Sequence, residues 1–296
     1  MGVHQIEGGS ATNGKQQVGW AIFVDDHYSH HAGLWNGNAD SWVDLNPNGA
    51  VHSWANGVWG DQQAGEARID DVTRAGLWYG TPGSWVDLSP VGAIWSSADG
   101  VWDGHQVGAV HFTSGGERAS LWSGSAHSRI DLHPGDALGS IAHGISANQQ
   151  VGQVNGWQTG FMDHASLWSG SADSWEDLHP ASATQSIAWG VSGGRQAGEV
   201  MIGGMTHASV WSGTAESWID LHEILPLGVY LESNAGYIEV SDGQIWVSGY
   251  ANNTYTGVCD AIVWHYTPDA VPEPSGLLVL GSGMLALAGM IRKKHG

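Results

Sequence analysis

Hydrophobic and polar residues alternate along most of this chain with a period of two, in short segments separated by glycine-rich turns. A period of two places successive side chains on opposite faces of a β-strand, whereas an amphipathic helix repeats every 3.6 residues. Between residues 140 and 178 this pattern predicts four strands, at 140–145, 150–156, 164–168 and 174–178. The segments between them, such as Ala147-Asn148-Gln149, contain residues that tolerate turn conformations. The chain is therefore predicted to be all-β.

The same arrangement recurs along the whole chain at a nearly constant interval. Each copy is marked by an aliphatic residue followed by tryptophan, with spacings of 43, 44, 46, 43 and 53 residues; the markers are Trp35, Trp78, Trp122, Trp168, Trp211 and Trp264. In the first five copies the marker opens the pattern Trp-x-Gly-x-x-x-Ser, followed by Trp-x-Asp-Leu in all but the third, which has Arg129 in place of the second tryptophan. Because the loop length is constant, we expect a hairpin of constant register.

A second motif lies between these copies and reads Ser-x-Ala-x-Gly, an aliphatic residue, a polar turn and then Gln-x-Gly. It occurs at residues 53–65, 96–108, 140–152 and 186–198, with a looser first copy that ends in Gln17-Val18-Gly19. We place the sixth copy at 241–251, where Val247-Ser248-Gly249-Tyr250-Ala251 is kept but the glutamine spacing is lost. Six units can be counted.

A unit of about 40 to 45 residues with four short antiparallel strands has the size of one β-propeller blade. We predict a β-propeller of about six four-stranded blades over residues 1–268, closed into a ring, with seven blades if the protein begins further upstream. An open β-solenoid is the alternative, although its repeats are usually shorter. Two interpretations of the N-terminal residues remain open. Met1 is an internal or mis-assigned start, or residues 3–6 form a short strand that completes the last blade and closes the fold.

The repeat resembles the extracellular propeller repeats with a His-Ala-x-Leu-Trp signature, called HAF repeats, over residues 10 to about 264. The match is best at His164-Ala165-Ser166-Leu167-Trp168 and at the corresponding residues 207–211. The chain departs from the signature where Arg74, Arg118 and Asp260 replace the histidine. Members of that family share no settled activity, so the resemblance implies a fold and little chemistry.

Composition and charge narrow the classes of function. The chain has 45 glycines, 18 tryptophans and only 13% charged residues, which is typical of a globular, turn-rich protein. Its formal net charge of −20 repels phosphate backbones, so we expect no nucleic-acid partner. The single Cys259 excludes an intramolecular disulfide and a cysteine metal cluster.

Two sets of repeated polar residues are candidate sites. The aspartates of Trp-x-Asp-Leu would form a ring in a propeller, and such a ring either holds a hard cation or simply caps turns; they are Asp44, Asp87, Asp131, Asp177 and Asp220. His31, His164 and His207 share one repeat position with two arginines, which favours hydrogen bonding over metal binding.

No catalytic constellation stands out elsewhere. Residues 190–194, Gly-Val-Ser-Gly-Gly, match the nucleophile motif of serine hydrolases, but that motif requires a strand-turn-helix and here it falls in a predicted polar turn. We therefore expect the match to be accidental, no cofactor to be needed and the chain not to be an enzyme.

The C-terminal residues form the most specific motif. The order is Val271, Pro272, Glu273 and Pro274 in a linker at 269–275, an apolar segment at 276–291, and a basic tail at 292–296 with Arg292, Lys293 and Lys294. This order resembles the PEP-CTERM sorting signal of Gram-negative bacteria. The resemblance implies export, a single C-terminal transmembrane helix as a transient anchor, and processing by an exosortase.

Two classes of function remain open from the sequence. The first is an exported cell-surface or extracellular-matrix protein whose propeller binds a polysaccharide or a surface protein. The second is a secreted propeller enzyme, a lyase or hydrolase acting on polysaccharide. An active site usually requires one blade to depart from the repeat, and residues 223–236 are the clearest departure.

Overall fold

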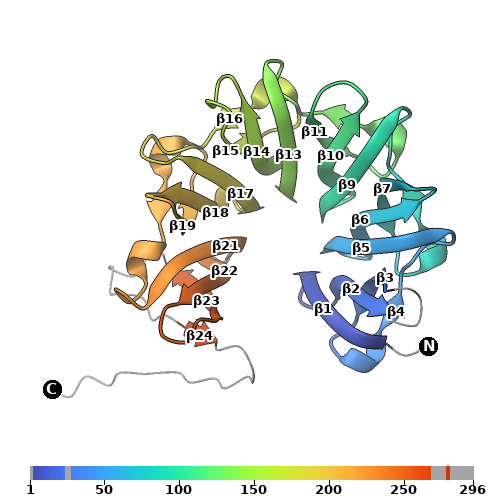
Figure 1. Ribbon diagram of the computed structural model, residues 1–296, viewed down its shortest axis with the longest axis horizontal. Helices are drawn as coiled ribbons and strands as arrows, with labels where there is room; N and C mark the ends of the chain where they lie inside the picture. The colour runs from blue at the N-terminus through green and yellow to red at the C-terminus, as the bar shows by residue number, and fades with distance from the viewer. Residues whose placement is uncertain (1–2, 24–27, 268–277, 281–296) are drawn as a thin grey trace. The chain divides into compact units, whose positions relative to one another are not determined.

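The computed structural model describes residues 3–23, 28–267 and 278–280, and it is all-β (Figure 1). Within these residues the strands form six antiparallel sheets, each of four strands that follow one another in the sequence. The chain divides into two compact units, Met1–Phe161 with Trp168–Trp175, and Met162–Leu167 with Glu176–Gly296. Each unit is considered by itself below.

The six sheets repeat one plan, with three longer strands and a short fourth strand. The first three sheets are β1 (Val3–Thr12), β2 (Gln17–Phe23), β3 (Ser29–Trp35) and β4 (Val43–Asp44); β5 (Ala50–Trp59), β6 (Gln62–Ile69), β7 (Val72–Trp78) and β8 (Val86–Asp87); and β9 (Ala93–Trp102), β10 (His105–Phe112), β11 (Glu117–Trp122) and β12 (Ile130–Asp131). The other three are β13 (Ala137–Ser146), β14 (Gln149–Gly156), β15 (His164–Trp168) and β16 (Glu176–Asp177); β17 (Gln185–Ser192), β18 (Arg195–Ile202), β19 (Met205–Trp211) and β20 (Ile219–Asp220); and β21 (Tyr230–Ser241), β22 (Gln244–Asn253), β23 (Cys259–Tyr266) and β24 (Leu278–Leu280).

The four strands predicted for the fourth repeat are present, but the last is shorter than expected. Only Glu176–Asp177 pairs with β15, because a 3-10 turn, η5 (Ala172–Ser174), precedes it. The Ser174 hydroxyl accepts a hydrogen bond from the Ser169 N–H at 2.8 Å and donates one to the Ser171 carbonyl at 2.6 Å. The same turn recurs as η2 (Ala39–Ser41), η3 (Pro82–Ser84), η4 (Ala126–Ser128) and η6 (Ala215–Ser217). The serine of Trp-x-Gly-x-x-x-Ser thus closes the hairpin loop.

The serine of Ser-x-Ala joins each sheet to the preceding one. Its hydroxyl accepts a hydrogen bond from a buried backbone N–H on the third strand of the preceding sheet, at 2.9 to 3.0 Å; the pairs are Ala32–Ser53, Ala75–Ser96, Ala119–Ser140, Ala165–Ser186 and Ala208–Ser233. Burial leaves no water to replace a lost partner, so each bond is costly to remove.

Gln-x-Gly fixes the loop of the third and fourth strands. The glutamine side-chain oxygen accepts a hydrogen bond from the glycine N–H of Trp-x-Gly at 2.7 to 3.0 Å; the pairs are Gln17–Gly37, Gln63–Gly80, Gln106–Gly124, Gln150–Gly170 and Gln196–Gly213. The glycine of Gln-x-Gly has a different role, since a Cβ at Gly65 would lie 2.0 Å from the Trp54 carbonyl oxygen. The glutamine of Gln-x-Gly is therefore explained by a hydrogen bond to the loop, and its glycine by the close approach of a backbone carbonyl.

The marker tryptophans occupy equivalent places in the packed core, as predicted. Trp78, Trp122 and Trp168 are fully buried, and each packs in a cluster with residues of the preceding sheet. Trp264 belongs to a cluster with Leu221 of the fifth repeat. A buried side chain of this size contributes a large apolar area to the contact between sheets.

The position of the sixth repeat differs from our prediction. Its Ser-x-Ala motif is Ser233-Asn234-Ala235 on β21, because Ser233 makes the hydrogen bond to the preceding sheet, and not the copy placed at 241–251. The error arose because this repeat has no glutamine at the spacing that was used for the alignment. Residues 3–6 also do not complete the sixth sheet, since they belong to β1 of the first.

The fourth strand of the sixth sheet is β24, within the segment predicted to be a transmembrane helix. β24 pairs with Ala261–Val263 of β23, whose edge would otherwise present unpaired backbone groups, and Leu-Val-Leu suits a strand. The other residues of 276–291, the linker motif at 271–274 and the basic residues 292–294 lie outside the described residues. Among the helices that the structure describes, none is long and apolar enough to cross a membrane.

Candidate functional site

Each repeated aspartate is hydrogen-bonded within its own repeat. One carboxylate oxygen contacts the residue thirteen positions earlier: Nδ1 of His31, His164 and His207 at 2.7 to 2.8 Å, or the guanidinium of Arg74 and Arg118 at 2.7 to 3.2 Å. The two candidate sets therefore form one set of pairs. Sequence reasoning missed this pairing, although the constant spacing of thirteen residues between a cationic or histidine side chain and an aspartate is visible in the first five copies.

The second oxygen of these aspartates caps a turn, as one of the two interpretations predicted. It accepts a hydrogen bond from the N–H two residues later at 2.8 to 3.0 Å, on Asn46, Ser89, His133, His179 and His222. Across residues 3–23, 28–267 and 278–280, no three His, Cys, Asp or Glu side chains are grouped as metal ligands. These hydrogen bonds of the aspartates stabilise the fourth strand and the turn that follows it.

Asp131 has an additional partner because the third repeat carries Arg129 in place of tryptophan. Its carboxylate lies 2.7 Å from Arg118 and 3.3 Å from Arg129. Burial opposes ionisation of this carboxyl, but the hydrogen bond from Arg118, that from the His133 N–H and the charges of both arginines outweigh it and lower the pKa of Asp131. A second ion pair therefore replaces aromatic packing in this repeat.

Three of the residues whose N–H groups bond to these aspartates are histidines, and their side chains face the next sheet. Nδ1 of His133, His179 and His222 lies 2.8 Å from the serine of the next Ser-x-Ala motif. Burial lowers the pKa of His179 and His222, and the neighbouring His164 and His207 lower it further. The neutral form of these two imidazoles is therefore favoured beside the serine of the next sheet.

The residues of the hydrolase-like motif at 190–194 do not form the strand-turn-helix of a serine-hydrolase nucleophile. Ser192 ends β17 and pairs with Arg195 across a tight antiparallel hairpin, with no helix after the turn. Its hydroxyl accepts a hydrogen bond from the Val240 N–H at 3.1 Å. Ser192 therefore serves the packing of β17 against β21.

Glu66, Asp99 and His143 form a titratable cluster on three consecutive sheets of the first unit. Asp99 lies 3.1 Å from Nδ1 of His143 and accepts a hydrogen bond from Ser97 at 2.8 Å. Burial, with the charge of Asp99 as a second cause, raises the pKa of Glu66 to about 7. Trp54 is the cross-strand neighbour of Glu66 and shares its face of the sheet. A carboxyl that titrates near neutrality can donate or accept a proton.

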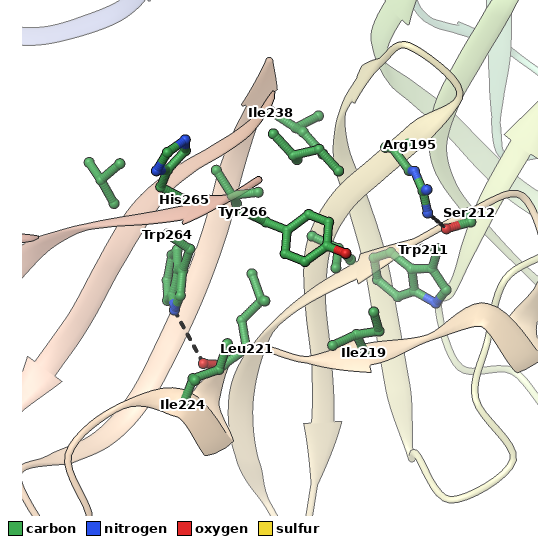
Figure 2. Close-up of a pocket in the computed structure, with 14 residues that line it drawn as sticks. Arg195, Trp211, Ser212, Ile219, Leu221, Ile224, Ile238, Trp264, His265 and Tyr266 are labelled. Carbon is green, nitrogen blue, oxygen red and sulfur yellow. Dashed lines mark hydrogen bonds between the residues drawn. The ribbon is translucent and has the colours of Figure 1, made fainter. Parts of the chain in front are cut away.

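A cavity of about 400 Å³ lies in the second unit between the fifth and sixth sheets (Figure 2). Its walls are apolar, with Ile219 and Leu221 from the fifth repeat and Ile238, Val247 and Trp264 from the sixth. Arg195, Ser212, His265 and Tyr266 add polar groups. A mostly apolar cavity with a few polar groups is the usual form of a small-molecule site. Ile224, which belongs to the segment 223–236 that departs from the repeat, also lines this cavity.

Comparison with known proteins identifies the fold as a β-propeller. A prolyl endopeptidase structure has a TM-score of 0.55 at 10% identity, over 88% of this chain and 42% of that one. A puromycin hydrolase gives 0.51 at 12%, over 90% and 46%. The β-propeller domain of the trilobed protease from Pyrococcus furiosus, described as having an open velcro topology, gives 0.56 at 11%, over 92% and 83%. No family model and no curated protein matches the chain.

These matches correct our expectation that the chain is not an enzyme. The matched structures are peptidases or the propeller domain of a protease, so this fold is no argument against catalysis. The chain spans less than half the length of the first two, and identities of 10 to 12% show the fold alone. Their activities are therefore not transferred to this protein.

Proposed function

We propose that this chain is an exported protein of the bacterial cell surface or extracellular matrix, sorted by an exosortase, whose propeller is a binding and structural module. The order of the C-terminal residues carries the proposal. The repeat pattern ends at Trp264, and Pro-Glu-Pro, an apolar segment and a basic tail follow in 271–294. This order has no counterpart in the repeats, which indicates a role separate from the propeller fold.

The physical properties of this segment suit a transient anchor. As a helix, the sixteen residues of 276–291 would extend about 24 Å, slightly less than a hydrocarbon core of about 30 Å, and the flanking cations reach the interface. The basic tail favours retention of that end in the cytoplasm. Because Leu278–Leu280 pair with β23, this proposal requires those residues to leave the sheet when the segment enters a membrane.

Fractionation in an exosortase-bearing host, with an export signal added, tests the sorting role. The full chain should first sediment with membranes and then lose its tail, whereas a Pro272→Ala, Glu273→Ala variant should stay membrane-bound and uncleaved. Pro268→Ala, a proline outside the motif, is the matched control and should be processed normally. Equal processing of all three chains would exclude the motif as the sorting signal.

The repeat design supports a binding role for the propeller. Serine and alanine of Ser-x-Ala-x-Gly are constant, while the residue after alanine changes from Asn56 to Asp99, His143 and Trp189. A constant frame with variable residues at one position presents different chemistry on a fixed scaffold. A glycan array and a pull-down with the full chain test whether the partner is a polysaccharide or a surface protein, and a folded protein without either partner would refute the binding role.

The Glu66 cluster favours a second candidate function, an enzyme that acts on polysaccharide. Glycoside hydrolysis uses a carboxylic acid that titrates near neutrality together with a second carboxyl group, and Glu66 and Asp99 are two neighbouring carboxyl groups of which Glu66 has a pKa of about 7. Turnover of neutral polysaccharides should then be lost in Glu66→Gln and retained in Ser192→Ala. Turnover that survives Glu66→Gln would refute this assignment.

A further inference from the structure

The cavity between the fifth and sixth sheets lies where the chain departs most from its own repeat. β23 ends in Trp264-His265-Tyr266, so the Trp-x-Gly turn of the first five repeats is absent there. An additional 3-10 turn, η7 (His222–Ile224), precedes β21 and contributes Ile224 to the wall. Departures of this kind from a regular scaffold mark places where function overrides the repeat.

Arg195 is the one arginine in the described part of the chain that pairs with no carboxylate. The others form ion pairs with aspartates: Arg68 with Asp71, Arg74 with Asp87, and Arg118 and Arg129 with Asp131. The guanidinium of Arg195 instead donates a hydrogen bond to the Ser212 hydroxyl at the rim of the cavity (Figure 2). This cation therefore has the capacity to bind an acidic group.

The repeat does not require an arginine at this position. The equivalent residues are Gln16, Gln62, His105 and Gln149, each directly before the glutamine of Gln-x-Gly. Gln62 makes the corresponding bond across the hairpin, from its side-chain amide to the Tyr79 hydroxyl at 3.3 Å. A neutral side chain is thus sufficient for the fold, and the positive charge of Arg195 needs another explanation.

We propose that this cavity binds a small monocarboxylate with an apolar body. The carboxylate pairs with the Arg195 guanidinium, whose planar fork suits that group, and the apolar body lies among Ile219, Ile238 and Trp264. At the packing density of protein interiors, about 0.74, the cavity accommodates a chain or ring system of roughly a dozen heavy atoms. This function is independent of the sorting signal and of the Glu66 cluster.

The overall negative charge of the protein means that only a local cation would favour a carboxylate ligand. A net charge of −20 repels anions from the surface as a whole. Binding of a carboxylate must therefore arise from a local cation, whereas an apolar alcohol of the same length would depend on the cavity walls alone. Decanoate and decanol, used below the concentration at which decanoate forms micelles, separate these two contributions.

Titration calorimetry on the full chain tests the proposal. We expect decanoate to bind with a dissociation constant of roughly 10 to 100 µM. Arg195→Gln, which installs the side chain found in the second and fourth repeats, should weaken decanoate at least about tenfold and change decanol by less than about twofold. Arg68→Gln removes a cation that does not line the cavity and should change neither. Thermal unfolding verifies that each variant is folded.

A second pair of variants locates the apolar part of the site. Ile219 is 54% exposed and lines the cavity, while Ile130 has the same repeat position in the third repeat and is 44% exposed. Ile219→Trp should fill the cavity and abolish binding of both ligands, and Ile130→Trp should leave both unchanged. The proposal is overturned if the folded parent protein binds no decanoate, if Arg195→Gln affects both ligands equally, or if Ile219→Trp still binds decanoate.

Discussion

Replacing Glu66 by glutamine should stabilise the protein in alkaline solution and leave it unchanged in acid. The pKa of this carboxyl rises from 4.5 to about 7 on folding because burial and Asp99 disfavour the ionised form. The folded state therefore binds a proton that the unfolded state releases between pH 4.5 and 7. The contribution of Glu66 to stability is therefore most favourable below pH 4.5 and falls as the pH rises through this window.

The size of the effect follows from the same shift. A rise from 4.5 to about 7 corresponds to at most roughly 3 kcal/mol of destabilisation above pH 7. Partial solvent contact of Glu66 and the burial of the new amide reduce the expected gain of Glu66→Gln to about 1 to 2 kcal/mol. A carboxyl retained at such a cost is typical of functional sites.

Urea unfolding followed by the fluorescence of the 18 tryptophans measures this gain at pH 4 and pH 8. Each variant is compared with the parent at the same pH, so titration of the histidines cancels. Glu176→Gln removes an exposed carboxylate and controls for the change in net charge. A gain of equal size at both pH values, or a loss at pH 8, would refute the reasoning.

Three further changes probe the frame of the repeat by the same unfolding measurement. Trp122→Ala should cost about 3 to 5 kcal/mol because the indole is fully buried, whereas Trp157→Ala, at a residue 74% exposed, should cost little. Ser140→Ala should cost about 1 to 3 kcal/mol, since it leaves a buried N–H without its acceptor. His179 has a lowered pKa, so its contribution to stability is complete above about pH 6.5 and declines below it; His179→Asn, which copies Asn46 of the first repeat, should reduce that acid loss.

The sequence predicted the strands and the marker tryptophans because both repeat at a fixed interval. It did not predict that Asp44 and His31 form one pair, since the repeat positions were considered separately. The sixth repeat was placed wrongly because one glutamine was the anchor of the alignment. The raised pKa of Glu66 depends on its burial in the folded protein and on Asp99 of the next sheet. The cavity depends on side chains of two sheets. Neither is visible in one linear motif.

The pairing of β24 with β23 has a consequence for the sorting that we propose. A cut after Pro274 would remove Leu278–Leu280 together with the anchor and leave Ala261–Val263 without their partner strand. An unpaired edge accepts a strand from another chain. If the chain is sorted as proposed, entry of 276–291 into the membrane would already withdraw Leu278–Leu280 from the sheet, and cleavage would make that loss permanent. Cross-linking should therefore join copies of a chain that ends at Pro274 more readily than copies of the full chain in the absence of membranes.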